Sequence, residues 1–131
     1  MRKILMVLAL AGFAACGDSG TGLVSVEGTY TLRSINGTNL PYIVLQSGTQ
    51  KIEVVDDVIS LATNGTYTEV GHTRTTLNGQ VTTDTGTDNG SYTTAGTSIT
   101  LRSSDGSSTI GTINGGTLTV VDQGLSAVFT R

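Results

Sequence analysis

The chain is poor in the residues on which most enzyme chemistry depends. Its 131 residues contain one cysteine, one histidine, one proline and no tryptophan, and charged residues make up 13% of it. Any His-based metal site or Ser-His-Asp relay would have to use His72. This histidine lies in a Thr-rich segment, where we expect an exposed strand residue. The composition therefore favours a protein that is not an enzyme and that needs no metal or cofactor.

The first residues have the order of a secretory signal. Arg2-Lys3 precede an apolar run over residues 4–11, and Phe-Ala-Ala-Cys occupies residues 13–16. This is a positive start, an apolar segment and small residues at a cleavage site. The apolar run is too short for a membrane-spanning helix, which needs about 20 residues.

A cysteine directly after small residues resembles the signal of bacterial lipoproteins, in which the thiol is acylated and the preceding segment is removed. The resemblance implies a lipid on Cys16 and anchoring to a membrane of the cell envelope. Gly17 stands where enterobacterial lipoproteins retained in the inner membrane have Asp, which favours the outer membrane. A plain secretory signal is the alternative, because Phe13 replaces the usual leucine. An acylated Cys16 leaves no thiol for a disulfide or for thiolate catalysis.

The chain that remains after residue 15 is acidic. It has ten negative side chains and five scattered positive ones, Arg33, Lys51, Arg74, Arg102 and Arg131. Binding to nucleic acid requires clustered Lys and Arg, so nucleic acid is not expected as a partner. Residues 17–24 are typical of a flexible tether. We therefore expect a signal over residues 1–15, a lipidated cysteine and tether over 16–26, and one folded domain over 27–131.

Regular turn signals divide the folded domain. Asn-Gly or Asp-Gly pairs begin at Asn36, Asn64, Asn78, Asn89, Asp105 and Asn114. Such pairs tolerate the positive φ that a type I′ hairpin turn requires at both central residues. Between them the chain is rich in Thr, Val, Ile, Leu and Tyr, which favour strands. No long segment keeps a helical period, so the pattern predicts an all-β meander.

Eight strands are predicted, with the fourth interrupted near residues 86–89. They cover residues 28–35, 51–62, 65–77, 80–94, 97–103, 107–113, 116–121 and 125–130. Apolar residues alternate with Thr and Ser in several of them, for example Tyr30 and Leu32 in the first strand, as expected when one face covers a core. Asp56-Asp57 predict a bulge or break. A meander of eight strands removes its free edges by closing into a barrel, with an open sandwich as the competitor.

Three segments share a Gly-x-Tyr-Thr pattern, beginning at Gly28, Gly65 and Gly90. We expect each tyrosine to cap the core with its hydroxyl in water. The first segment, with the Asn36-Gly37 turn after it and the Phe-Thr-Arg end of the chain, resembles small bacterial lipocalin-like lipoproteins. That resemblance implies an up-and-down barrel closed at one end by Gly28, Tyr30 and a late arginine, Arg131 or Arg102, stacked on the tyrosine ring. The chain lacks the Trp and the disulfide of lipocalins and is shorter.

Two acidic segments are weak candidates for chemistry. The segment from Asp84 to Gly90 has some of the residues of a calcium loop but lacks its spacing, and Ala95 occupies the position of the bidentate glutamate. Asp56 and Asp57, with Glu53 nearby, could form a catalytic carboxylate pair. Adjacent strand residues point to opposite faces, so we expect neither calcium binding nor catalysis here.

Two classes of function remain open. The first is a binding module that holds a small apolar or amphipathic molecule at the open end of the barrel, with candidate contacts from a loop over residues 40–50 and from two later tyrosines: Tyr42, Ile43, Leu45, Tyr67 and Tyr92. The second is a structural or protein-interaction lipoprotein, such as a protease-inhibitor-like module, whose short chain fills its own barrel. An empty or a filled barrel interior would separate the two classes.

Overall fold

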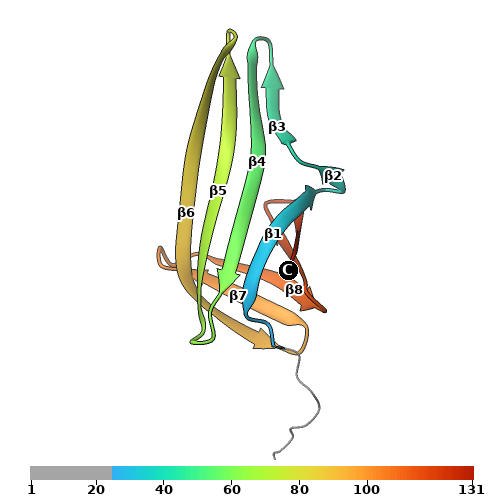
Figure 1. The fold of residues 1–131 in the computed structure, drawn as a ribbon, viewed down its shortest axis with the longest axis vertical. Coiled ribbons are helices and arrows are strands. Elements are labelled where there is room, and N and C mark those ends of the chain that lie inside the picture. The colour runs from blue at the N-terminus through green and yellow to red at the C-terminus, as the bar shows by residue number, and fades with distance from the viewer. Residues whose placement is uncertain (1–24) are drawn as a thin grey trace, which may run out of the picture.

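The computed structural model describes residues 25–131, which form an antiparallel meander without helices (Figure 1). No helix in this part of the chain could cross a membrane. The strands are β1 (Gly28–Ile35), β2 (Thr38–Asn39), β3 (Tyr42–Ser47), β4 (Gln50–Leu61), β5 (Thr66–Leu77), β6 (Gln80–Ala95), β7 (Ser98–Ser103), β8 (Ser108–Asn114), β9 (Thr117–Asp122) and β10 (Leu125–Thr130).

Eight of these strands close into a barrel. From β4 to β10 each strand pairs with the next one in sequence, and β1 completes the ring by pairing with both β10 and β4. The closed barrel confirms the fold predicted from the turn signals and the alternation. The expected signal and the lipidated cysteine lie outside the described residues.

Three strands, β4, β5 and β6, extend well beyond one end of the barrel. β1 contacts β4 only over residues 58–61, and β7 contacts β6 only over residues 90–95. The remaining parts of β4, β5 and β6 continue past the barrel, and β3 pairs along β4 there. We call this four-stranded sheet, formed by β3 and residues 50–56, 71–77 and 80–86, the extension. In Figure 1 it rises above one end of the barrel.

The structure corrects several details of the predicted strands. The expected loop over residues 40–50 contains β3, and β6 runs through residues 86–89 without interruption. The segment from Asp84 to Gly90 is thus a strand and not a loop. The irregularity expected near Asp56-Asp57 is present, because the register between β4 and β5 shifts between Val54 and Asp56.

The turn signals are correct for most hairpins. Asn36-Gly37 and Asn78-Gly79 have positive φ at both residues, as a type I′ turn requires. The Asn89-Gly90 pair lies inside β6 and makes no turn. A Cβ atom at Gly90 would lie 1.9 Å from the carbonyl oxygen of Arg102, so this glycine lets β7 approach. Gln123-Gly124 form the turn between the last two strands, where the predicted strand bounds left a gap but no Asn-Gly or Asp-Gly pair marks it.

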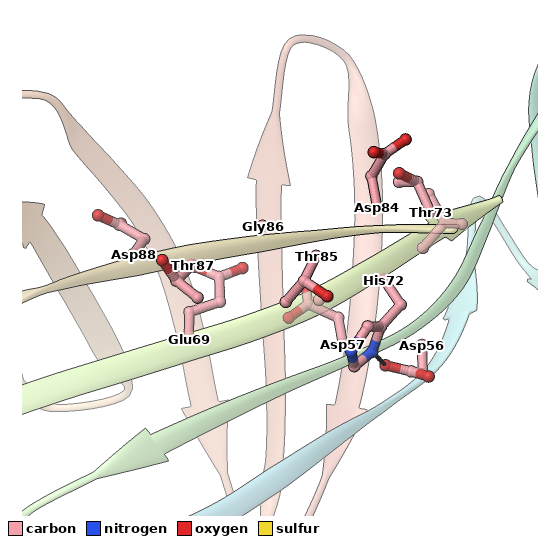
Figure 2. A pocket seen from close by; sticks show the side chains of 12 residues that line it. Asp56, Asp57, Glu69, His72, Thr73, Asp84, Thr85, Gly86, Thr87 and Asp88 are labelled. Atoms are coloured by element: carbon pink, nitrogen blue, oxygen red, sulfur yellow. Dashed lines mark hydrogen bonds and ion pairs between the residues drawn. The ribbon is translucent and has the colours of Figure 1, made fainter. Parts of the chain in front are cut away.

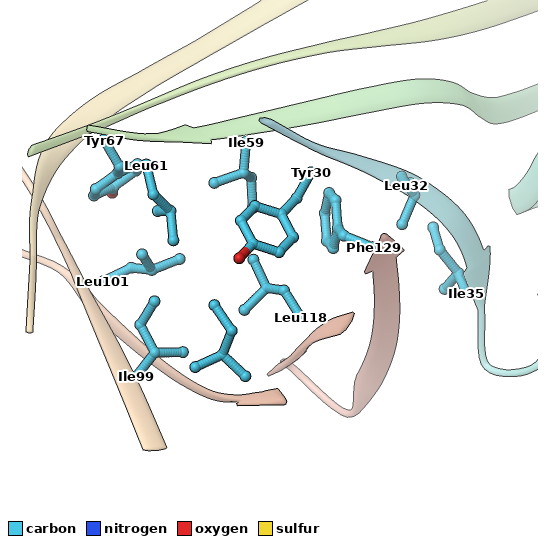
Figure 3. Packing of buried hydrophobic residues seen from close by; sticks show 11 residues of the cluster. Tyr30, Leu32, Ile35, Ile59, Leu61, Tyr67, Ile99, Leu101, Leu118 and Phe129 are labelled. Carbon is cyan, nitrogen blue, oxygen red and sulfur yellow. The ribbon is translucent and has the colours of Figure 1, made fainter. Parts of the chain in front are cut away.

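The core fills the lower part of the barrel. Its apolar side chains interdigitate in the interior (Figure 3), and they come from seven of the eight barrel strands. The buried residues are Tyr30, Leu32, Ile35, Ile59, Leu61, Tyr67, Ile99, Leu101, Ile113, Leu118 and Phe129. This part of the barrel is solid, because these side chains occupy its interior.

One end of the barrel is closed by the two ends of the folded domain. The guanidinium carbon of Arg131 lies 5.5 Å from the centroid of the Tyr30 ring, within the range of a cation–π contact. The same guanidinium donates hydrogen bonds to the carbonyl oxygens of Ser25 and Glu27. Gly28 has φ +140°, and a Cβ atom there would lie 2.6 Å from Cδ of Arg131. The chain therefore enters the barrel at this closed end. The stacking of Arg131 on Tyr30 is one of the two contacts that the family resemblance implied.

Candidate functional site at the open end of the barrel

The opposite end of the barrel, beneath the extension, holds a cavity of about 350 Å³. Its floor is the upper surface of the core, formed by Ile35, Ile59, Leu101 and Phe129. Val120, Leu125 and Ala127 add apolar wall from β9 and β10. Ligand sites in proteins are concave, mostly apolar and about 300–1,000 Å³ in volume, so this cavity is the size of a small ligand site.

Four carboxylates line the same cavity: Asp57, Glu69, Asp88 and Asp122. They come from β4, β5, β6 and β9. The positions of three of them follow from strand alternation, since side chains two residues apart share a face. Asp57 shares the face of buried Ile59, Glu69 that of buried Tyr67, and Asp122 that of Val120. The acidic side chains thus form the level directly above the apolar core.

Both carboxylate oxygens of Asp88 accept hydrogen bonds from protein hydroxyls. It accepts a hydrogen bond of 2.6 Å from the Tyr67 hydroxyl and one of 2.5 Å from the Ser103 hydroxyl. Burial works to raise the pKa of Asp88, but the hydrogen bonds from Ser103 and Tyr67 outweigh it and the pKa of that carboxyl is lowered. Desolvation and the bond to Asp88 both raise the pKa of Tyr67. Asp88 therefore stays ionised, and its oxygens are fixed by neutral donors.

Asp57 and Glu69 lack such support. Burial is the largest cause that raises the pKa of Glu69, to about 8, and the negative charge of Asp57 adds to it. Burial also raises the pKa of Asp57, against the opposing effects of the neighbouring Glu69 carboxyl and the Val58 backbone. The Oδ1 atom of Asp57 is shielded from solvent and has no hydrogen-bond partner among residues 25–131. Burial and the repulsion between the two carboxyls therefore favour a protonated form of this pair.

A second hollow of about 420 Å³ continues from the mouth along β4, β5 and β6 of the extension (Figure 2). It shares Asp57, Glu69 and Asp88 with the cavity. Opposite Asp57, the β5 and β6 ladder carries Gly71 and Gly86. The Asp57 side chain occupies the space over Gly71, whereas a Cβ atom at Gly86 would meet no atom within 4 Å. The mouth is thus open toward the extension.

His72 lies beside this hollow and is paired. Its Nδ1 atom lies 2.6 Å from Oδ1 of Asp56, and both side chains are partly exposed. Asp56 and Asp57 both line the hollow, but the Asp56 carboxylate pairs with His72 whereas the Asp57 carboxyl lies over Gly71. Among residues 25–131 no group of three or more His, Cys, Asp or Glu side chains is arranged to hold a metal ion.

The predicted ligand contacts do not come together. Tyr67 lines the cavity. Tyr42 packs against the edge of the core, and Ile43 and Leu45 are exposed on β3, on the outer edge of the extension. Tyr92 donates a hydrogen bond of 2.6 Å to the carbonyl oxygen of Ala62. None of these four belongs to the lining of the cavity.

The hydroxyl of each tyrosine in the Gly-x-Tyr pattern donates a hydrogen bond to the protein, where the sequence predicted a hydroxyl in water. Tyr30 donates to the carbonyl oxygen of Val26 over 2.7 Å, and Tyr67 donates to Asp88. The pattern therefore marks three tyrosines that tie neighbouring segments together. Only one of them, Tyr67, belongs to the mouth.

The acidic level of the mouth was missed by the sequence analysis. A signal for it exists, because Asp57 and Asp122 continue the apolar faces of their strands and so must point inward if those faces do. Comparison with protein-family models, with curated proteins and with solved structures found no match to this chain. The site is therefore interpreted from its own geometry.

Proposed function

We propose that this protein is a lipid-anchored lipoprotein of the bacterial cell envelope, of the lipocalin-like kind, that binds a small amphipathic molecule in the mouth of its barrel. The observation that carries the proposal is the cavity of about 350 Å³ with an apolar floor and polar rim. An eight-stranded barrel can be filled by side chains or can hold one small ligand. Here the lower part is filled and the upper part is open.

The position of the expected anchor is consistent with this function. Cys16 lies nine residues before Ser25, so a lipid there could be at most about 30 Å from the closed end. Arg131 holds Ser25 to the closed end, opposite the cavity. An anchored molecule would therefore direct its mouth away from the membrane, where ligands from the surrounding compartment can enter.

The ligand proposal is tested by native mass spectrometry on residues 16–131 carrying Cys16→Ser, after incubation with envelope lipid extract. We expect a discrete added mass. Ala127→Phe, which puts a ring into the cavity, should remove it, and Val121→Phe, on the exposed face of β9, should not. Leu125→Trp at the rim serves as a second blocking variant if Ala127→Phe does not fold. An unchanged protein mass under all conditions would contradict ligand binding.

The anchor is tested separately, by metabolic labelling of the full chain with a radioactive fatty acid. We expect the label on the wild-type protein and none on Cys16→Ser. A labelled Cys16→Ser variant, or an unlabelled wild-type protein in the medium, would favour the plain secretory signal.

A protein-interaction module is the alternative, and β3 is the observation that favours it. This strand forms a free edge of the extension, contains no charged residue, and exposes Ile43, Val44 and Leu45. Such an edge can accept an extended apolar segment of a partner protein by strand addition. If Val44→Lys abolished a function of the protein in the envelope and Ala127→Phe did not, the interaction module would replace the ligand-binding one.

A further inference from the structure

We propose that the molecule bound in the mouth is an amphipathic cation, whose apolar part covers the floor of the cavity and whose amine lies between Asp57 and Glu69. The inference rests on the proposed function, since it assigns the charge of the ligand to the same cavity.

The cavity has the two surfaces that such a molecule needs. Its floor and one wall are apolar, and the carboxylates stand together at one level above them. No Lys, Arg or His lines the cavity. The nearest imidazole, His72, lies in the adjoining hollow and is already paired with Asp56. The negative charge of the mouth is therefore not neutralised from within the described part of the chain.

Asp88 serves as an internal comparison for the other two carboxyls. The fold supplies it with two hydroxyl donors, Tyr67 and Ser103. Asp57, at the same mouth, has an oxygen that is buried and accepts no hydrogen bond from residues 25–131. Burying an unpaired carboxylate oxygen costs stability. Rotation of the Asp57 side chain away from Gly71 would expose this oxygen to the cavity, where an ammonium N–H of a ligand could satisfy it.

The raised pKa of Glu69, about 8, supports the same conclusion. The groups that face Glu69 are Asp57 on β4, Asp88 on β6 and Asp122 on β9, all of them acidic, and Tyr67 on its own strand. Without a positive partner the pair retains a proton. A bound ammonium group would favour the ionised form and displace that proton, so binding should strengthen as the pH rises through 8.

The test compares three probes with the same chain and different charge: n-octylamine, n-octanol and n-octanoate. Isothermal titration calorimetry on residues 16–131 carrying Cys16→Ser should show octylamine binding at least about tenfold more tightly than octanol, the size of one charge-assisted hydrogen bond, and octanoate binding most weakly. At pH 7, octylamine binding should release protons, detected as a dependence of the heat on the ionisation enthalpy of the buffer. Its affinity should increase at pH 9, where an alkylamine is still charged.

The matched variants separate the charge of the mouth from the charge of the whole protein. Asp57→Asn/Glu69→Gln should lose the preference for octylamine while octanol binding stays unchanged. Glu27→Gln/Asp105→Asn removes two negative charges that line neither the cavity nor the adjoining hollow, and it should leave the preference intact. The first double variant should also unfold at higher temperature, because neutral groups are less costly to bury. This thermal measurement checks that it is folded.

The outcomes distinguish this inference from the proposed function. Equal affinity for octylamine and octanol, with both abolished by Ala127→Phe, would overturn the cationic ligand and leave the binding module in place. An octylamine preference that survives Asp57→Asn/Glu69→Gln would also overturn it, because the amine would then bind elsewhere. Binding of none of the three probes, with no adduct from lipid extract, would overturn the proposed function itself.

Discussion

The barrel and the extension are built from the same three strands but are stabilised in different ways. Inside the barrel, β4, β5 and β6 turn one face toward a closed apolar core. In the extension, the same strands form a single layer, and residues 80–87 of β6 are exposed along their whole length. Burial of apolar surface is the main source of stability in a small domain. Apolar burial therefore stabilises the barrel strongly and the extension only slightly.

Ion pairs partly replace burial in the extension. Glu53 is buried and lies 3.0 Å from Arg74 and 3.3 Å from Lys51. The hydrogen bond from Arg74 is the main reason that the pKa of Glu53 lies below its ordinary value. At the end of the extension, Asn78 forms the β5–β6 turn and accepts a hydrogen bond from Thr49 over 2.8 Å. In the extension, strand pairing, turn contacts and ion pairs thus take the place of an apolar core.

The largest difference between the two regions should appear when an apolar side chain is shortened. Leu118→Ala in the barrel removes a fully buried side chain and should lower the free energy of unfolding by about 2–5 kcal/mol. Val81→Ala in the extension, where the side chain is 61% exposed, should change it by less than about 0.5 kcal/mol. Urea denaturation measures both. Similar losses would mean that the extension has a core of its own.

Two glycines of β6 sharpen the comparison within one strand. A Cβ atom at Gly90 would collide with the backbone of Arg102, whereas one at Gly86 meets no atom within 4 Å. Gly90→Ala should therefore cost about 1–3 kcal/mol of unfolding free energy. Gly86→Ala should be neutral or stabilising by up to about 1 kcal/mol, since glycine weakens strands. A neutral Gly90→Ala in thermal or urea unfolding would mean that β6 and β7 can separate at no cost.

Replacing Arg74 should increase local opening of the extension and leave the barrel unchanged. Arg74→Met breaks the pair with Glu53 and leaves the barrel core untouched. We expect hydrogen exchange of backbone amides to accelerate by about tenfold in the extension parts of β4 and β5. Amides of β9 and β10 should keep their rates. Arg33→Met, which removes a hydrogen bond to Thr130 on the barrel surface, is the control. Equal acceleration in both regions would mean that they unfold as one unit.

The two regions should also respond to pH in opposite directions. The pKa of Glu53 is lowered, so its contribution to the extension is present above the ordinary value of 4.5 and is lost as the pH falls through the lowered pKa. The pKa of Glu69 is raised to about 8, so the folded mouth holds a proton that the unfolded chain has released. Stability of the barrel should therefore decrease as the pH rises from 4.5 to 8.

Amide exchange and thermal melting between pH 3.5 and pH 8.5 measure the two trends. Glu69→Gln should remove the decrease between pH 4.5 and 8 without changing the acid loosening of the extension. A pH profile that is unchanged by Glu69→Gln would mean that another group holds the proton of the mouth.

Much of the fold was predictable because its signals are local. Tyr30 and Leu32 alternate with polar neighbours, and Asn78-Gly79 fix a hairpin turn, so strand faces and many strand ends can be recognised within a few residues. β3 was missed because its apolar residues show no alternation, and both of its faces are partly exposed. Asn89-Gly90 was misassigned because a pair that favours a turn can also sit in a strand when a neighbouring backbone approaches closely.

The sequence by itself determined the all-β meander and favoured a closed eight-stranded barrel over an open sandwich. The family resemblance implied a contact of Tyr30 with Arg131 or Arg102, and the tertiary structure decided for Arg131. Only the tertiary structure decided which acids meet. Asp57 and Glu69 lie near each other on the paired strands β4 and β5. Asp122 is far away in sequence, and it joins them because closure of the barrel brings β9 around the same opening. The extension was decided in the same way, by where β1 and β7 stop pairing with their longer neighbours. Both features depend on long-range register, which no local pattern specifies.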